Sequence, residues 1–326
     1  MTEQAALLEV RKLRTTFSVG GRSVPAVRDV SFSIMPEEVL GLIGESGSGK
    51  TVTGLSLLRL LPEHASVEAD AIVFRGADIA SLPEEAFRTL RGLEMAMIFQ
   101  DPMGSFNPAK TVGWQLKQAI RRRHEKSQGD EGDWKGEATQ LLKDVGIRAP
   151  ERVLSSYPHQ LSGGMLQRVL IAMVIALSPV LIIADEPTTN LDNLVERQIL
   201  DLIRLHQSRL GASVLFVTHD LAIAGEICDR IAVMYAGEIV EIGPADEVLK
   251  RPKHPYSAGL LQTSASLERR DEYLYELPGE PGLRGPALGC GFAPRCPHAM
   301  AECGSRHPEF VAVGPDHNAR CLLYGR

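Results

Sequence analysis

Apolar and polar residues follow two different spacings along this chain. Over residues 7–34 they alternate around a Gly20-Gly21 turn, which predicts antiparallel strands. Over residues 100–177 the apolar positions recur at helical spacing, and short apolar runs then alternate with helical stretches as far as residue 242. The expected helices are 50–61, 112–123, 136–145, 163–177, 194–208 and 221–227, and the further strands are 39–43, 71–74, 95–99, 180–184, 213–217, 231–235 and 239–242.

This succession predicts an α/β fold with a mostly parallel sheet that helices cover on both faces. The antiparallel strands form an N-terminal subdomain, and residues from about 100 to 177 form a helical subdomain. Polar, glycine-containing residues 124–135 predict a mobile loop between two of its helices. Beyond residue 249 the sequence is rich in proline, glycine and cysteine. We therefore expect a main domain over residues 1–250 and a C-terminal extension over 251–326.

The longest apolar run, residues 169–184, resembles a membrane span at first sight. Ser178 and Pro179 interrupt it, and it is shorter than the roughly 18 residues that a span needs. The run therefore predicts a buried helix that ends near Leu177, followed by a buried strand. The first ten residues include Glu3 and lack a basic stretch followed by an apolar one, so we expect no secretory signal and a cytoplasmic chain.

Composition excludes little beyond this. The chain has 326 residues, 44% of them hydrophobic and 23% charged, which is ordinary for a soluble globular protein. Its formal net charge of −6 argues against a nucleic-acid-binding protein, because such proteins usually carry a basic excess.

A glycine-rich string follows the predicted strand 39–43. It reads G-E-S-G-S-G-K-T and fits the phosphate-loop pattern G-x-x-x-x-G-K-[ST]. Its glycines allow backbone N–H groups to point at phosphate oxygens, Lys50 reaches the β- and γ-phosphates, and Thr51 offers a hydroxyl to Mg²⁺. A chance glycine turn before a helix is the alternative. The nucleotide-binding residues assigned here are Gly44, Glu45, Ser46, Gly47, Ser48, Gly49, Lys50 and Thr51.

A second acidic motif ends the apolar strand 180–184. Asp185 at the strand end is placed to hold Mg²⁺, and Glu186 is placed to polarise an attacking water molecule. Alone, the motif fits a solvated strand end equally well. Together with the phosphate loop it predicts a Mg–nucleotide site.

Many phosphate-loop proteins share the two motifs above, and the string Leu161-Ser-Gly-Gly-Met165 singles out one family among them. Ser162, Gly163 and Gly164 open a long helix, so they form a second surface suited to phosphate. Here the sequence resembles the ABC ATPases, whose signature reads LSGGQ or LSGGM. In that family this surface closes over the ATP that the partner subunit holds.

Further residues match the ABC pattern in order. The resemblance implies that Gln100 contacts Mg²⁺ and the attacking water, and that His219 bonds the γ-phosphate and orients Glu186. Residues 190–192 read Asn-Leu-Asp and match the loop across the dimer interface, where Asn190 departs from the commoner alanine. Phe17 is the candidate for stacking on adenine, with a core aromatic as the alternative. The implied catalytic residues are Lys50, Gln100, Glu186 and His219.

Several strings narrow the resemblance to the ATPases of dipeptide and oligopeptide importers. They are F-Q-D-P-M at 99–103, S-F-N-P at 105–108, Y-P-H-Q-L-S-G-G-M at 157–165 and H-P-Y at 254–256. The resemblance implies ATP and Mg²⁺ as cofactors, and peptide, nickel or metal-chelate import as the function. It also implies a second, usually non-identical ABC ATPase, two transmembrane permease subunits, an extracytoplasmic substrate-binding protein, and a peripheral location on the cytoplasmic face of the membrane.

Two rival classes explain less of the sequence. Soluble ABC ATPases that act on DNA or ribosomes carry inserted coiled coils or zinc modules, or two motors in one chain, and none of these is recognisable here. A phosphate-loop kinase or GTPase leaves the string at 161–165 unexplained.

Four of the five cysteines gather in the extension, with the spacing C-x5-C-x6-C-x17-C. In a cytosolic chain such a group favours a metal site over disulfides, and thiolates favour zinc or an iron–sulfur cluster. The spacing is unlike that of common zinc sites, and the resemblance implies a [4Fe–4S] cluster. Zinc and unliganded thiols stay open as alternatives. The candidate ligands are Cys290, Cys296, Cys303 and Cys321.

Overall fold

The computed structural model describes residues 5–127, 132–189, 193–269, 275, 277–280 and 288–325. It divides into two compact units. The phosphate-loop unit joins Met1–Ser81 to Leu215–Arg326, and the signature unit is Leu82–Val214. The first unit is therefore discontinuous along the chain.

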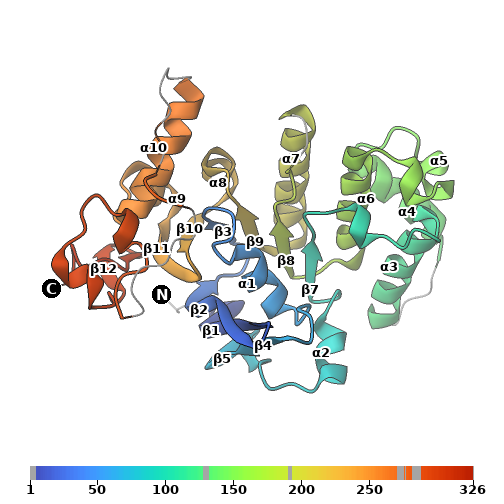
Figure 1. Ribbon diagram of the computed structural model, residues 1–326. Coiled ribbons are helices and arrows are strands. Elements are labelled where there is room, and N and C mark those ends of the chain that lie inside the picture. Colours follow the sequence, from blue (N-terminus) through green and yellow to red (C-terminus); the bar gives the residue numbers. More distant parts are fainter. Residues whose placement is uncertain are drawn as a thin grey trace. The chain divides into compact units, whose positions relative to one another are not determined.

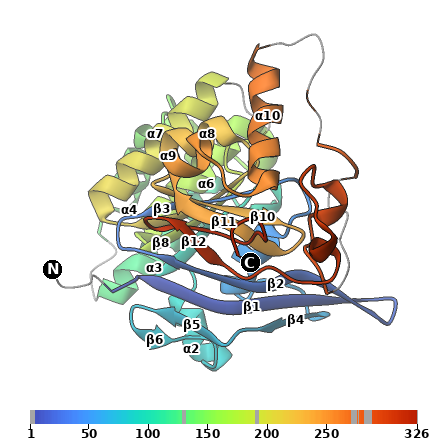
Figure 2. The same ribbon diagram turned by 90° about the vertical axis from the view of Figure 1, so that its left-hand side faces the viewer.

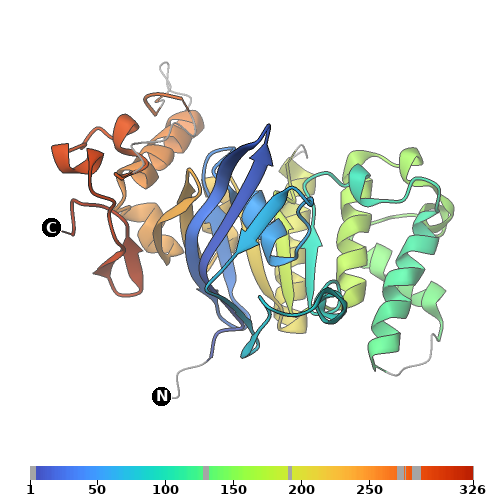
Figure 3. The same ribbon diagram turned by 60° about the horizontal axis from the view of Figure 1, so that its bottom comes forward.

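A long antiparallel hairpin begins the phosphate-loop unit. Strands β1 (Leu8–Val19) and β2 (Arg22–Ile34) pair from Leu8↔Ile34 to Val19↔Arg22, as the alternating pattern predicts (Figure 3). Strands β4 (Ala65–Glu68) and β5 (Ala71–Phe74) pair antiparallel with β1, and β6 (Ala77–Asp78) pairs with β5. Leu8, Val10 and Leu13 of β1 are buried.

A second sheet in this unit has the order β12-β13-β11-β10-β3-β9. Its central strand β3 (Val39–Ile43) is buried along its whole length and runs parallel to β10 (Arg230–Tyr235). An all-apolar strand suits such a doubly covered position. Residues 215–218 of β9 (Ser213–Thr218) belong to this unit. Its helices are α1 (Lys50–Leu57), α8 (Leu221–Ile227), α9 (Ala245–Lys250) and α10 (Pro255–Arg269).

The C-terminal residues extend this sheet. Strand β13 (His317–Ala319) pairs antiparallel with β11 (Glu238–Pro244), and β12 (Val311–Gly314) pairs with β13. Figure 2 shows these red strands along the orange β10–β11 pair. The extension also contains helix α10, which the proline- and glycine-rich composition did not predict.

Helices dominate the signature unit. Four of them pack together as the predicted helical subdomain (Figure 1). They are α3 (Val112–Ser127), α4 (Trp134–Asp144), α5 (Pro150–Ser155) and α6 (Gly163–Leu177). Strand β7 (Met95–Ile98) pairs in parallel with β8 (Leu181–Asp185). Helices α2 (Glu84–Leu90) and α7 (Asn193–Leu210) complete the unit.

Two helix ends differ most from the predictions, each by four residues. Helix α3 continues to Ser127 and α4 begins at Trp134, so the loop predicted for residues 124–135 is wrong over 124–127 and 134–135. Side-chain contacts hold this last turn of α3, since His124 Nε2 lies 3.1 Å from Glu137 Oε2 of α4 and Lys126 Nζ contacts Glu94 Oε1 at 2.5 Å. Helix α1 ends at Leu57, four residues before the expected 61. There Arg59 takes a left-handed backbone (φ 51°).

The apolar run 169–184 forms helix and strand as predicted, with Ser178 in a left-handed conformation between them. Throughout the described ranges, none of the helices combines the length and the apolar character that crossing a bilayer requires.

Candidate nucleotide-binding site

The glycine-rich loop connects β3 to α1 in the phosphate-loop unit. Gly44 (φ 155°) and Gly49 (φ 107°) have backbone conformations that L-residues rarely adopt. A Cβ on Gly44 would lie 2.2 Å from the carbonyl oxygen of Met234, and one on Gly49 would lie 2.6 Å from that of Ala26. The packing of this loop therefore requires glycine at both positions.

Two polar side chains in this loop are buried. Lys50 is 5% exposed, and its Nζ donates to the carbonyl oxygens of Gly44 at 2.7 Å and Glu45 at 3.0 Å. Ser48 is 3% exposed, and within the described ranges its Oγ has no hydrogen-bond partner. A buried hydroxyl without a partner is costly. This cationic loop with a spare hydroxyl therefore fits a phosphate group, and Thr51 follows in the first turn of α1.

Phe17 lies on β1, opposite Val24 of β2 and Ala65 of β4. Its ring is half-buried and tilted by 53° against His64, with 5.9 Å between ring centroids. This placement differs from that of a core aromatic such as Phe216, which is fully buried. Stacking on adenine stays a prediction.

The acidic strand end lies in the signature unit. All five residues of β8 are buried, and Asp185 is 2% exposed. Glu186 follows in a left-handed conformation (φ 44°). Gln100 Nε2 donates to Glu186 Oε2 at 2.9 Å, and Thr189 Oγ1 donates to the same oxygen at 3.0 Å. The structure thus brings together two predicted residues, Gln100 and Glu186, and adds Thr189, which sequence reasoning missed.

Ser162 is the N-cap of α6, and its Oγ accepts from the Met165 N–H at 3.4 Å. Ser162 and Gly163 are exposed, and a Cβ on Gly163 would have no atom within 4 Å. The predicted phosphate-binding surface is therefore open. Farther along α6, the buried Gln167 donates through Nε2 to the Pro187 carbonyl at 2.8 Å. This bond connects α6 to the segment that follows Glu186.

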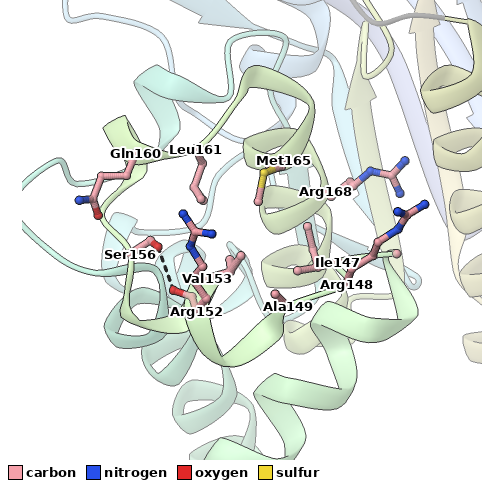
Figure 4. Close-up of a pocket in the computed structure, with 11 residues that line it drawn as sticks. Ile147, Arg148, Ala149, Arg152, Val153, Ser156, Gln160, Leu161, Met165 and Arg168 are labelled. Atoms are coloured by element: carbon pink, nitrogen blue, oxygen red, sulfur yellow. Dashed lines mark hydrogen bonds between the residues drawn. The ribbon is translucent and has the colours of Figure 1, made fainter.

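A pocket of about 520 Å³ lies beside the signature string (Figure 4). The guanidinium of Arg152 points toward Leu161, while those of Arg148 and Arg168 lie at the opposite side. The sequence did not predict this cationic pocket. It is lined by Gly146, Ile147, Arg148, Ala149, Arg152, Val153, Ser156, Gln160, Leu161, Met165 and Arg168.

His219 directly follows β9 and is exposed. The next residue, Asp220, caps α8, because its Oδ1 accepts from the N–H groups of Ala222 at 2.8 Å and Ile223 at 3.1 Å. The start of a helix therefore fixes the backbone beside His219. The interface loop expected at residues 190–192 lies outside the described residues.

Comparisons with known proteins identify the family. Residues 27–189 match the ABC transporter family. The chain belongs to this family. Residues 240–303 of this ABC protein also match the family described as the oligopeptide/dipeptide transporter, C-terminal region. The resemblance stated from the sequence is thereby confirmed.

Similar proteins cover almost the whole ABC chain. A putative peptide import ATP-binding protein of Brucella melitensis is 43% identical over 331 residues, covering 98% of this chain and 97% of that protein. A probable peptide ABC transporter ATP-binding protein of Sinorhizobium fredii is 44% identical over 319 residues, covering 97% and 94%. A solved ATP-binding cassette, dimeric and bound to ADP and Pi, matches with a TM-score of 0.64 and 25% identity, covering 73% of this chain and 98% of that one. The chain is therefore an ABC-type ATPase with the predicted α/β fold.

The C-terminal region of this ABC ATPase is fastened to β11 through one buried carboxylate. Glu241 is fully buried and accepts from the N–H groups of Lys253 and His254, each at 2.8 Å. His317 Nε2 lies 2.7 Å from Glu241 Oε1. Burial lowers the pKa of His254 to about 3, and its Nδ1 accepts from the Tyr256 N–H at 3.0 Å. A buried carboxylate is stable only with such partners, so Glu241 holds both ends of the extension.

The four cysteines of the extension line one small apolar pocket, together with His254 and Phe292. Burial raises the pKa of the Cys290, Cys296 and Cys321 thiols, and the Met300 N–H donates to Cys303 Sγ at 3.4 Å. Across the described part of the chain, however, no three His, Cys, Asp or Glu side chains are grouped so that they could hold a single metal ion.

Proposed function

We propose that this ATPase powers the import of dipeptides or oligopeptides through separate permease subunits. The observation that carries the proposal is the match of residues 240–303 to the oligopeptide/dipeptide transporter C-terminal region, in a chain whose residues 27–189 match the ABC transporter family. Relatives in Brucella and Sinorhizobium over nearly the full length are named for peptide import or peptide transport. Nickel and metal-chelate import gain no comparable support.

In this proposal the loop from Gly44 to Thr51 cradles the phosphates of ATP, and Lys50 supplies the positive charge. The buried Lys50 ammonium and the Ser48 hydroxyl, which has no hydrogen-bond partner among the described residues, support this assignment. Thr51, Asp185 and Gln100 hold Mg²⁺, which offsets charge on the phosphates. Phe17 stacks on adenine.

Glu186 accepts the proton of the attacking water, and His219 orients it. Support comes from the two hydrogen bonds that hold the Glu186 carboxylate, from Gln100 and Thr189. Ser162, Gly163 and Gly164 serve the ATP of a partner subunit. The exposure of Ser162 and Gly163 at the start of α6 supports that role.

The proposed assembly contains a second, non-identical ABC ATPase, two transmembrane permeases and an extracytoplasmic substrate-binding protein. It places this chain on the cytoplasmic face of the membrane as a peripheral subunit and involves no nucleic acid. The match to a cassette solved as a dimer supports pairing.

We also propose that Cys290, Cys296, Cys303 and Cys321 bind a [4Fe–4S] cluster rather than zinc. Four sulfurs that line one pocket, one of which accepts a backbone N–H group, support it. A single zinc ion needs its ligands closely grouped, whereas each thiolate of a cluster binds its own iron. Such a cluster would cross-link an extension that has little apolar core of its own.

Uptake by whole cells tests the transport proposal. A strain that lacks this gene should lose uptake of a radiolabelled dipeptide or oligopeptide, and the wild-type gene should restore it. The Glu186→Gln gene should not restore it, while uptake of radioactive nickel should be the same in all three strains. Loss of nickel uptake with normal peptide uptake would reject peptide as the cargo.

A further inference from the structure

One residue of the phosphate loop is held by the C-terminal extension. Glu45 Oε2 accepts from Arg295 Nη1 at 2.7 Å, and Oε1 accepts from Nη2 at 2.9 Å. The Glu45 N–H donates to Tyr256 Oη at 2.9 Å, while its carbonyl accepts from Lys50 Nζ at 3.0 Å. Glu45 therefore joins the extension directly to the lysine of the phosphate loop.

Arg295 is buried, and several contacts fix its side chain. It is 2% exposed, its Nε donates to the Pro278 carbonyl at 2.7 Å, and its guanidinium lies over the rings of Tyr235 and Phe292 at 5.7 and 6.0 Å. A short turn, Ala293–Arg295, presents it. A two-pronged bond from a buried guanidinium to a carboxylate is strong and directional, unlike an exposed ion pair.

Tyr256 is equally confined. It is fully buried and packs edge-on against Tyr235, with 4.7 Å between ring centroids. Burial raises the pKa of its hydroxyl, so the group stays neutral at physiological pH. Its oxygen accepts from the N–H of the Gly44–Glu45 peptide group and so fixes the direction of that group, whose Gly44 carbonyl accepts from Lys50 Nζ at 2.7 Å.

We propose that Arg295 and Tyr256 are positioning residues for the phosphate loop, and that Arg295 neutralises the Glu45 carboxylate, which would otherwise repel the phosphates of ATP. This inference rests on the proposed nucleotide site. A carboxylate within a loop that binds a multiply charged anion is unfavourable unless a cation neutralises it. Tyr256 keeps the loop backbone in the conformation that holds Lys50.

Calorimetric titration of the full chain with the Mg²⁺ complex of a non-hydrolysable ATP analogue tests the proposal. Arg295→Gln should raise Kd about tenfold or more, as expected for a lost charge-assisted hydrogen bond. The double variant Glu45→Gln/Arg295→Gln should return Kd to within about threefold of wild type, because no unpaired carboxylate remains. Arg295→Lys keeps the charge but not the two-pronged bond, so it should lie between the wild type and Arg295→Gln.

The double variant distinguishes the effect of an unpaired Glu45 carboxylate on affinity from the effect of a damaged extension. It lacks the same guanidinium, so any loss of affinity caused by a disordered extension would persist in it. An equally weak double variant, or unchanged affinity in Arg295→Gln, would overturn the role of Arg295. Tyr256→Phe should raise Kd several-fold, and unchanged affinity would overturn the role of Tyr256.

Two further variants complete the design. Arg320→Gln is the matched control, since Arg320 bonds the carbonyls of Ile239 and Pro308 and should leave Kd unchanged. Lys50→Ala tests the nucleotide site itself. If Lys50→Ala binds the analogue normally, the proposed function of the loop fails. If the Arg295 variants bind the analogue normally while Lys50→Ala does not, the proposed role of Arg295 fails but the proposed nucleotide site stands.

Discussion

The amide of Gln100 donates its hydrogen bond to the Glu186 carboxylate, with 2.9 Å between Nε2 and Oε2. These residues are 86 positions apart, and each follows the end of a strand, β7 or β8, in one parallel pair. The parallel pairing brings the two strand ends together and makes the contact possible. A displacement of the segment after β7 would therefore change the hydrogen bonding of the proposed general base.

Replacing Glu186 by glutamine should lower steady-state ATP hydrolysis by about 100-fold or more, the range of general-base catalysis. Binding of the ATP analogue should be unchanged, because the phosphate loop is untouched. Glu85→Gln, an exposed acid on α2, is the matched control and should hydrolyse normally. If the assembled complex kept near-normal turnover with Glu186→Gln, or its equivalent, in both ATP sites, then Glu186 would not be the general base.

Thr189→Val removes one of the two donors to Glu186 Oε2 while keeping nearly the same shape. Turnover should fall by roughly tenfold to 100-fold, the value of one hydrogen bond to a charged group, without a change in nucleotide affinity. Thr189→Ser keeps a hydroxyl and should recover most of the rate. A valine variant as active as the wild type would show that the bond is dispensable.

Iron and zinc analysis of protein purified without oxygen tests the cysteine site. About four iron atoms per chain, with matching sulfide, are expected for the cluster. Cys296→Ser should lose the iron and leave binding of the ATP analogue measurable, whereas Cys228→Ala, outside the extension, should keep the iron. Zinc without iron would reject the cluster, and freely alkylated thiols with neither metal would reject both.

The extension should lose stability in acid through His254. Its folded pKa of about 3 lies below the unfolded value near 6.5, so below pH 6.5 the unfolded state binds the proton more strongly. The free energy of opening should fall by up to about 1.4 kcal/mol per pH unit, a loss that ends near pH 3. Hydrogen exchange of the α10 amides between pH 7 and 5 measures this. His254→Gln should show a shallower slope, and equal slopes would exclude His254 as the cause.

Local patterns sufficed for much of this fold. The β1–β2 hairpin follows from the alternation of apolar and polar residues around the Gly20-Gly21 turn, and α8 has the predicted bounds because Asp220 caps its first turn. The family itself was recognisable because three phosphate-related strings occur in order. Each of these features depends on residues close in sequence.

Tertiary contacts explain what the sequence did not predict. Arg295 and Glu45 are 250 positions apart, and nothing in the string around Cys296 indicates an ion pair with the phosphate loop. Strands β12 and β13 are too short to show a repeating pattern of apolar and polar residues. They are recognisable as strands only because β13 pairs with β11 and β12 pairs with β13. Thr189 gained significance only once Glu186 was placed.

The division of the phosphate-loop unit along the chain governs the order in which the protein can form on the ribosome. Strand β3 ends at Ile43, yet its parallel neighbour β10 begins at Arg230, and Arg295 is translated later still. The signature unit is continuous and can collapse as it emerges, because domains fold from the N-terminal end during synthesis. The glycine-rich loop proposed to bind ATP is thus among the first segments translated and among the last to acquire its neighbours. A nascent chain that stops before the extension would carry this loop without the hydrogen bonds of Glu45 to Arg295 and Tyr256.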